Sequence, residues 1–184
     1  YDESLLVNPL NNGIKNVFVY VVRRKEFQAA TTLRQTPVKV RFIGCRVEPR
    51  CVAVQTEQEL HFHYDDPVLH IPDMKPSANH SWPWHFPIDG VSRGSFRHTE
   101  ALPFQYTCAI HPWIRGWILV CDHPFATITD TDGNFAIRGV RYGEHKLRVF
   151  HEGGGLLNHS LKVVINSDEV ELPDLSFEAS RFGY

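Results

Sequence analysis

The chain has 184 residues, of which 42% are hydrophobic and 22% charged, and its formal net charge is −2. This composition is typical of a folded soluble protein, and the length allows one large or two small domains. The near-neutral charge provides no field that favours nucleic acid or an anionic membrane, and the absence of an apolar run of about 18 residues predicts no membrane span.

Strand patterns follow one another along the chain. Residues 16–22 are β-branched and aromatic, and a short helical piece is expected in 24–34. After the long irregular stretch 71–94, apolar runs at 102–106 and 117–120 predict strands on either side of a loop. Further strands are predicted at residues 125–129, 134–137, 145–150 and 161–165. Because no convincing amphipathic helix exceeds two turns, the sequence predicts an all-β fold.

Two loops carry residues that are typical metal ligands. Cys108 and His111 lie three positions apart between the two apolar runs, and His70 ends the upstream motif Asp-Asp-Pro-Val-Leu-His. One Cys and two His form the equatorial ligand set of a blue-copper centre, because thiolate and imidazole together select copper. The alternative is that these side chains simply occupy loops. A zinc site is also conceivable, although Ile114 argues against the open polar fourth position that it would need.

The motif Cys-x2-His-Pro-Trp-x-Arg-Gly-x-Ile-x-Val, which begins at Cys108, resembles the ligand loop of small bacterial cupredoxins of the amicyanin type. Residues 66–70 resemble the loop that carries the first histidine of that family. Three further segments resemble the opening strands of a cupredoxin, namely residues 38–49, 52–54 and 59–62. The resemblance implies a cupredoxin-like Greek-key β-sandwich over residues 36–122 that binds one type-1-like copper through His70, Cys108 and His111 and carries single electrons.

Three positions depart from the family's pattern. Ile114 stands where the family has its axial Met, Ile71 where an Asn follows the first ligand His, and Tyr64 where an Asn ends the preceding strand. Because the axial ligand is weak and mainly tunes the potential, Ile114 as a non-ligand predicts a trigonal centre of higher potential. Losing the Asn side chains removes hydrogen bonds that hold ligands in place. The single methionine, Met74, lies on a different loop.

The two ends of the chain carry a second resemblance. Residues 126–137 and 143–150 resemble the second half of a carboxypeptidase regulatory-like, transthyretin-like sandwich, and residues 13–22 fit its first half. This implies that the cupredoxin-like domain is inserted in, or fused to, a transthyretin-like β-sandwich. The expected domains are 36–122, cupredoxin-like, and 1–35 plus 123–184, transthyretin-like.

Two functions from different classes follow from these features. The first is a bacterial periplasmic or secreted electron carrier or electron-transferring subunit with copper. The second is a copper-free structural or accessory subunit that keeps the cupredoxin fold. An enzyme is not expected, since no catalytic motif is found. The expected partner is a redox protein such as a cytochrome or dehydrogenase, or a larger assembly that docks on the loop with Trp82 and Trp84.

The four cysteines bear on the choice between these functions. Cys51 and Cys121 lie in predicted strands and are candidates for a disulfide, although four reduced cysteines are equally compatible with the sequence. A bridge between Cys45 and Cys108 would leave no thiolate for copper. An unbridged Cys108 is therefore necessary, though not sufficient, for a copper site.

Overall fold

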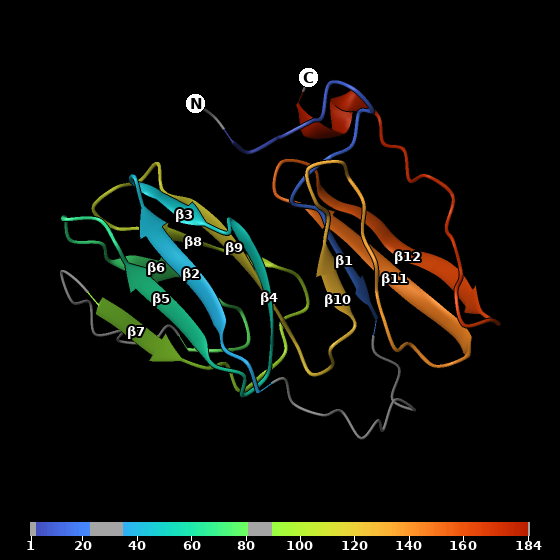
Figure 1. Ribbon diagram of the computed structural model, residues 1–184, viewed down its shortest axis with the longest axis horizontal. Helices are drawn as coiled ribbons and strands as arrows, with labels where there is room; N and C mark the ends of the chain where they lie inside the picture. Colours follow the sequence, from blue (N-terminus) through green and yellow to red (C-terminus); the bar gives the residue numbers. More distant parts are fainter. Residues whose placement is uncertain (1–2, 23–34, 81–89, 184) are drawn as a thin grey trace. The chain divides into compact units, whose positions relative to one another are not determined.

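The computed structural model of the protein describes residues 3–22, 35–80 and 90–183 (Figure 1). In this part of the chain, regular structure is β-strand apart from a single 3-10 turn, which confirms the predicted all-β fold. The described residues include no helix with the length and apolar character to cross a membrane. The helical piece expected in 24–34 lies outside the described residues, as do Trp82 and Trp84.

The chain divides into two compact units. One unit combines Tyr1–Ala29 with Phe125–Tyr184, and the other is Ala30–Pro124. In the first unit, four strands form an antiparallel sheet in the order β10-β1-β11-β12. The elements of this unit are β1 (Phe18–Val21), β10 (Ala126–Ile128), β11 (Gly143–His151), β12 (Gly155–Ile165) and the 3-10 turn η1 (Ala179–Phe182).

β1 lies inside this sheet, although about a hundred residues separate it from its neighbours in sequence. Phe18 is opposite Ile128 on β10 and opposite Phe150 on β11. All four residues of β1 are buried, and because successive side chains point to opposite faces, both faces of this strand are covered. The N-terminal strand and the C-terminal strands therefore share one sheet, which is the pairing that the split resemblance implied.

The predicted strand at residues 134–137 is absent from the structure, which shows only the turn before it. The Asp130 N–H donates to the Asn134 carbonyl at 3.0 Å, and the Asp130 carboxylate accepts from the N–H groups of Asp132 and Asn134. Phe135 and Ile137 pack against the apolar core of this unit without joining the strand ladder. Their alternation therefore reflects side-chain packing, which the sequence pattern does not distinguish from strand pairing.

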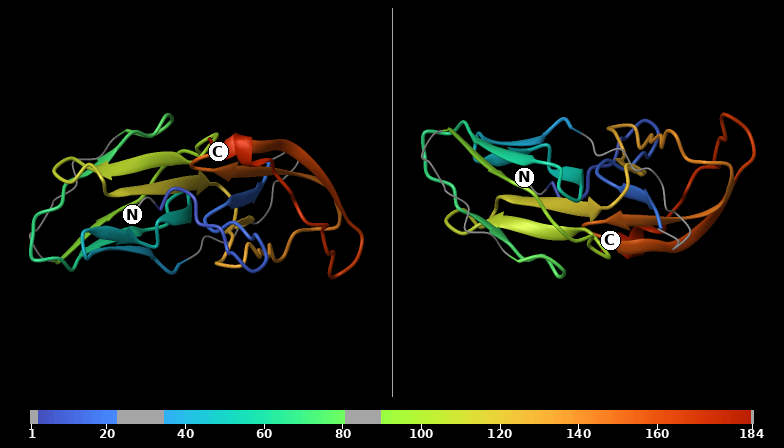
Figure 2. Two further views of the ribbon diagram at one scale, coloured as in Figure 1. Left: turned by 90° about the horizontal axis from the view of Figure 1, so that it is seen from above. Right: turned by 90° about the horizontal axis from the view of Figure 1, so that it is seen from below.

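The second unit contains two four-stranded sheets, ordered β3-β2-β5-β7 and β4-β9-β8-β6. The strands are β2 (Val38–Ile43), β3 (Arg46–Glu48), β4 (Cys51–Gln55), β5 (Leu60–Tyr64), β6 (Pro72–Met74), β7 (Gly90–Gly94), β8 (Phe104–Cys108) and β9 (Arg115–Cys121). Two of the pairings, β2 with β5 and β4 with β9, are parallel. Parallel neighbours arise here because the chain crosses to the other sheet before it returns to pair. Figure 2 shows the two layers edge-on.

One apolar core fills the space between these two sheets. β5 illustrates why, since its residues 60, 62 and 64 are buried while His61 and His63 on the opposite face are more exposed. Phe42 and Phe62 from one sheet belong to the same core cluster as Tyr106 and Ile118 from the other. Each fully buried side chain of this size stabilises the folded state by about 1.5–3 kcal/mol. Cys108 and Ile114 belong to the same cluster, so the candidate ligand loop is attached to the core.

Gly116 allows the Tyr106 ring to lie against β9. The two residues are directly opposite each other in the β8–β9 ladder, and a Cβ on Gly116 would clash with the buried ring of Tyr106. We therefore expect Gly116→Ala to lower the free energy of unfolding by about 1–3 kcal/mol, measured by urea denaturation. In a Tyr106→Leu background the same substitution should cost less, and an equal cost in both backgrounds would contradict this explanation.

Candidate metal centre

The structure brings the three predicted ligand residues together. His70 lies in the connection between β5 and β6, Cys108 is the last residue of β8, and His111 lies in the connection between β8 and β9. One ligand atom from each residue lies within 4.8 Å of the other two. His70 and Cys108 are buried, and His111 is half-buried. Among the described residues, this is the group of His, Cys, Asp and Glu side chains that could hold a metal ion.

The distances within the cluster suit a bound metal ion. The Cys108 Sγ lies 3.8 Å from the Nδ1 of His70 and 3.6 Å from the Nδ1 of His111. Bonds of about 2.3 Å to thiolate and about 2.0–2.1 Å to imidazole, as zinc makes, would place S and N about 3.5–3.8 Å apart at angles near 110–120°. The donor set and its spacing therefore fit a first-row ion, and the thiolate with two imidazoles favours copper.

The loop from Cys108 to Ile114 is closed by its own backbone. The Cys108 N–H donates to the Ile114 carbonyl at 3.2 Å, and the Ile114 N–H donates to the His111 carbonyl at 2.9 Å. Ile114 is only 2% exposed, so its aliphatic side chain is part of the core next to Cys108. An apolar side chain at this position offers no donor atom to a metal and keeps water away from the thiolate.

Ile71 fixes the ligand loops through its backbone. The Ile71 N–H donates to the Cys108 Sγ at 3.4 Å, and the Ala109 N–H donates to the Ile71 carbonyl at 2.8 Å. Pro72 and Cys108 are also paired between β6 and β8. The two loops are therefore joined through backbone hydrogen bonds at position 71, although the Asn side chain expected there is missing.

Asp66 and Phe42 surround His70, and sequence reasoning gave neither residue a role at the site. The Asp66 carboxylate lies 2.9 Å from the Nε2 of His70, and the Phe42 ring stacks on the imidazole with ring centroids 4.8 Å apart. Burial favours a higher pKa for Asp66, but hydrogen bonds from the backbone N–H groups of Cys45 and Gly44 and from His70 outweigh it and hold this pKa below its usual value. In the sequence, the acidic residue four positions before His70 was the feature that could have indicated this partner.

Tyr64 and Met74 occupy the core rather than the candidate centre. Tyr64 stacks on Phe42 with centroids 5.3 Å apart, on a ring that itself stacks on His70, and burial raises the pKa of Tyr64 to about 12. Met74, which was expected on a loop, is instead buried in β6 opposite Tyr106, so the stretch 71–94 is not irregular throughout. Tyr64 therefore supports the candidate ligand His70 indirectly, through the Phe42 ring on which both stack.

The disulfide considered between Cys51 and Cys121 is not present, and none of the four cysteines is in a disulfide. In the β4–β9 ladder Cys51 is opposite Trp117 and Cys121 is opposite Gln55. This offset of four residues corresponds to about 13 Å along the strands, whereas a disulfide requires Cα atoms within about 7 Å. Burial raises the pKa of Cys121 to about 12. Cys108 carries a thiol, so the necessary condition for a copper site is met.

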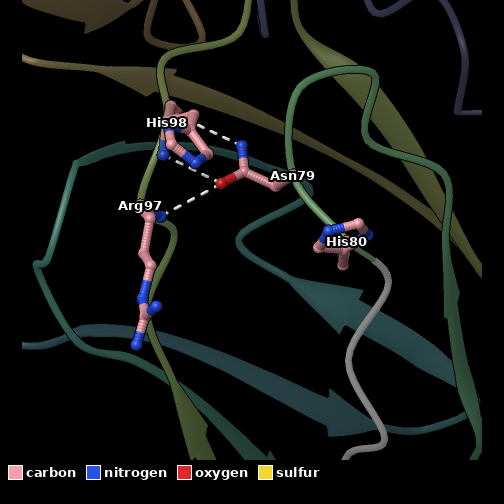
Figure 3. A pocket seen from close by; sticks show the side chains of 4 residues that line it. All are labelled: Asn79, His80, Arg97 and His98. Atoms are coloured by element: carbon pink, nitrogen blue, oxygen red, sulfur yellow. Dashed lines mark hydrogen bonds between the residues drawn. The ribbon is translucent and has the colours of Figure 1, made fainter.

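A hollow of about 360 Å³ lies elsewhere on the same unit and is lined by Asn79, His80, Arg97 and His98 (Figure 3). The side-chain amide of Asn79 donates to the His98 carbonyl and to the buried Glu100 carboxylate, and it accepts from the N–H groups of Arg97 and His98. All four interactions join two segments of this protein. Asn79 therefore has a structural role, and the hollow is separate from the metal-ligand candidates.

Comparison with solved structures finds a Cu-containing nitrite reductase, an amicyanin and a purple cupredoxin. The chain is similar to a Cu-containing nitrite reductase (NirK) from Thermus scotoductus SA-01, with TM-score 0.38, 19% identity and coverage of 48% of this chain and 23% of that chain. Amicyanin from Paracoccus versutus is similar with TM-score 0.40, 14% identity and coverage of 48% and 85%. A purple cupredoxin from Nitrosopumilus maritimus is similar with TM-score 0.36, 14% identity and coverage of 45% and 98%.

No protein-family model and no curated protein matches the chain. The chain spans less than a quarter of the nitrite reductase, and the three TM-scores lie below 0.5. The function of this protein is therefore inferred from its own residues and their geometry.

Proposed function

We propose that this protein is a cupredoxin-like electron carrier or electron-transferring subunit that binds one copper ion through His70, Cys108 and His111. The observation that carries the proposal is the arrangement of these three side chains, whose ligand atoms lie within 4.8 Å of one another. They come from two loops that are 38 positions apart in sequence at His70 and Cys108. A thiolate and two imidazoles in one buried cluster are unusual unless they serve a metal.

A bound copper would supply one-electron exchange, and the surrounding residues prepare the site for it. His70 and Cys108 are buried, which excludes water from the thiolate. Ile114 adds no fourth donor, which favours three-coordinate copper over zinc, since zinc in catalytic sites keeps a polar fourth position. The half-buried His111 provides the side of the cluster nearest to solvent.

The two ligand loops also present apolar side chains to solvent, which suits docking of a redox partner such as a cytochrome or dehydrogenase. Ile110 and Trp113 are exposed beside His111, and the Trp113 ring contacts the imidazole with centroids 5.2 Å apart. Val68 and Leu69 are exposed just before His70. Exposed aromatic and aliphatic side chains concentrate at protein interfaces, so a partner that docks here would approach the ligand His111. Docking of a larger assembly on Trp82 and Trp84 belongs to the same proposal.

The proposal also includes a division of the chain into two domains. We assign residues 36–122 to a cupredoxin-like domain and residues 1–35 plus 123–184 to a transthyretin-like domain, of which the described residues show one four-stranded sheet. The sharing of one sheet by β1, β10 and β11 supports this division. A periplasmic or secreted location in a bacterium fits an electron carrier of this kind. We assign the protein no catalytic activity of its own.

The altered residues at positions 64, 71 and 114 favour a second function, a copper-free accessory subunit that keeps the fold. Metal analysis separates the two functions. We expect the purified protein, after incubation with Cu(II) and removal of excess metal, to hold one copper per chain and to show intense visible absorption from thiolate-to-copper charge transfer. Stoichiometric zinc, or no bound metal after reconstitution, would favour the accessory subunit.

A further inference from the structure

The Asp66 carboxylate joins two segments beside the candidate centre. Its Oδ1 accepts from the Gly44 N–H at 2.6 Å, and its Oδ2 accepts from the Cys45 N–H at 3.0 Å. The same Oδ2 lies 2.9 Å from the Nε2 of His70. Asp66 is 8% exposed, so these interactions form away from bulk water, where hydrogen bonds to a carboxylate are strong. One side chain thus ties the β2–β3 turn to the first candidate ligand.

The contact with Asp66 determines which nitrogen of His70 carries the proton. An ionised carboxylate can only accept hydrogen bonds, so the Nε2 of His70 must donate. The Nδ1 of the neutral ring is then left with its lone pair, and it is this atom that lies 3.8 Å from the Cys108 Sγ. Stacking of Phe42 on the ring restricts its rotation as well. Asp66 therefore holds the Nε2 edge of the His70 ring and Phe42 covers one face, which leaves the unprotonated Nδ1 available to a metal ion.

We propose that Asp66 is a positioning residue that sets the tautomer and orientation of His70 before a metal binds. This inference rests on the proposed copper function, since orienting His70 matters only if His70 binds a metal. The effect of Asp66 on the His70 tautomer, however, can be measured in the metal-free protein. A purely structural carboxylate would tie the turn at Gly44 and Cys45 without determining the protonated nitrogen of His70.

The test compares Asp66→Ala with Asp65→Ala, which makes the same change at the next residue. Asp65 pairs with Arg41 at 2.6 Å on the surface, so it provides a matched control. In metal-free protein labelled with ¹⁵N-histidine, at about pH 8 where an unperturbed imidazole is neutral, two-bond ¹H–¹⁵N correlations report the tautomer of each ring. We expect the Nε2–H tautomer at His70 in the parent protein and in Asp65→Ala, and a mixture or the Nδ1–H tautomer in Asp66→Ala.

Cu(I) affinity, measured by competition with a chromogenic chelator, provides the second readout. Asp66→Ala should bind Cu(I) about 10–100-fold more weakly than the parent, as is typical when the partner of a ligating His is removed, while Asp65→Ala should be unchanged. If Asp66→Ala does not fold, Asp66→Asn keeps the shape and should shift both readouts in the same direction, because its single acceptor oxygen must serve three N–H groups.

The outcomes separate this inference from the proposed function. An Nδ1–H tautomer in the parent, an unchanged tautomer in the folded Asp66 variant, or equal Cu(I) affinities would overturn the role of Asp66. A tautomer change in a protein that binds no copper would support Asp66 as the residue that orients His70 and would refute the copper function instead.

Discussion

The Cys108→Ser variant is expected to lose the intense visible absorption of the copper-loaded protein. The absorption arises from charge transfer between thiolate sulfur and copper, and a serine hydroxyl is a harder donor that cannot supply it. Because Cys108 is 1% exposed and lies between His70 and His111, no other thiol in the cluster can replace it. The measurement is the visible spectrum after Cu(II) addition, together with copper content per chain.

Cys45→Ser is the matched control for this experiment. Cys45 is partly buried, packs at the border of the same core and is not part of the three-residue cluster. Its substitution removes a thiol from the same unit and should leave the absorption intact. If the colour survived in Cys108→Ser, or disappeared in Cys45→Ser, the assignment of Cys108 as the thiolate ligand would be wrong. Unfolding curves of both variants establish that each is folded.

The Ile114→Met variant is expected to have a lower reduction potential than the parent protein. A thioether beside the three ligands would donate weakly to copper and stabilise Cu(II) relative to Cu(I). A shift of about 59 mV corresponds to a tenfold change in a one-electron equilibrium, or about 1.4 kcal/mol, and an effect on that order is expected. Since Ile and Met are similar in volume, the substitution should cost less than about 1.5 kcal/mol of stability.

Voltammetry measures the reduction potentials of Ile114→Met and Ile118→Met. The comparison distinguishes a thioether that lies next to the three candidate ligands from a thioether placed elsewhere in the core. Ile118 is fully buried in the same cluster, opposite Phe104 in the β8–β9 ladder and away from the ligand loop. Its substitution introduces the same thioether and should leave the potential unchanged. Equal potentials in the parent and in Ile114→Met would mean that the side chain at this position does not face the metal.

The site residues differ in how far the sequence could indicate them. Cys108 and His111 share one short loop, so their proximity follows from spacing alone, and His70 was added by its resemblance to a family motif. Asp66 lies only four positions before His70, so the sequence did contain a local signal for that contact, whereas the contacts of Asp66 with the β2–β3 turn come from a segment about twenty residues earlier. Contacts between loops distant in sequence have no local pattern.

The fold shows the same limits. The strand signals predicted an all-β protein, since alternation and β-branched residues follow from local geometry. The pattern at residues 134–137 had the same appearance, but this segment packs its apolar side chains without a strand partner. Cys51 and Cys121 were both correctly expected in strands, whereas the offset between them depends on the parallel register of β4 and β9. Register and pairing partners are long-range properties that single-sequence patterns do not contain.

The interior place of β1 between β10 and β11 has a consequence for synthesis of the protein. β1 is made early, but its partners are made about a hundred residues later, which takes roughly 5–20 s at ordinary rates of translation. During that time the β2–β9 unit can close, while the apolar strand Phe18–Val21 has neither neighbour. Until β10 and β11 are made, a nascent chain of this protein therefore has a strand with two open edges, and open edges favour pairing with the wrong strand.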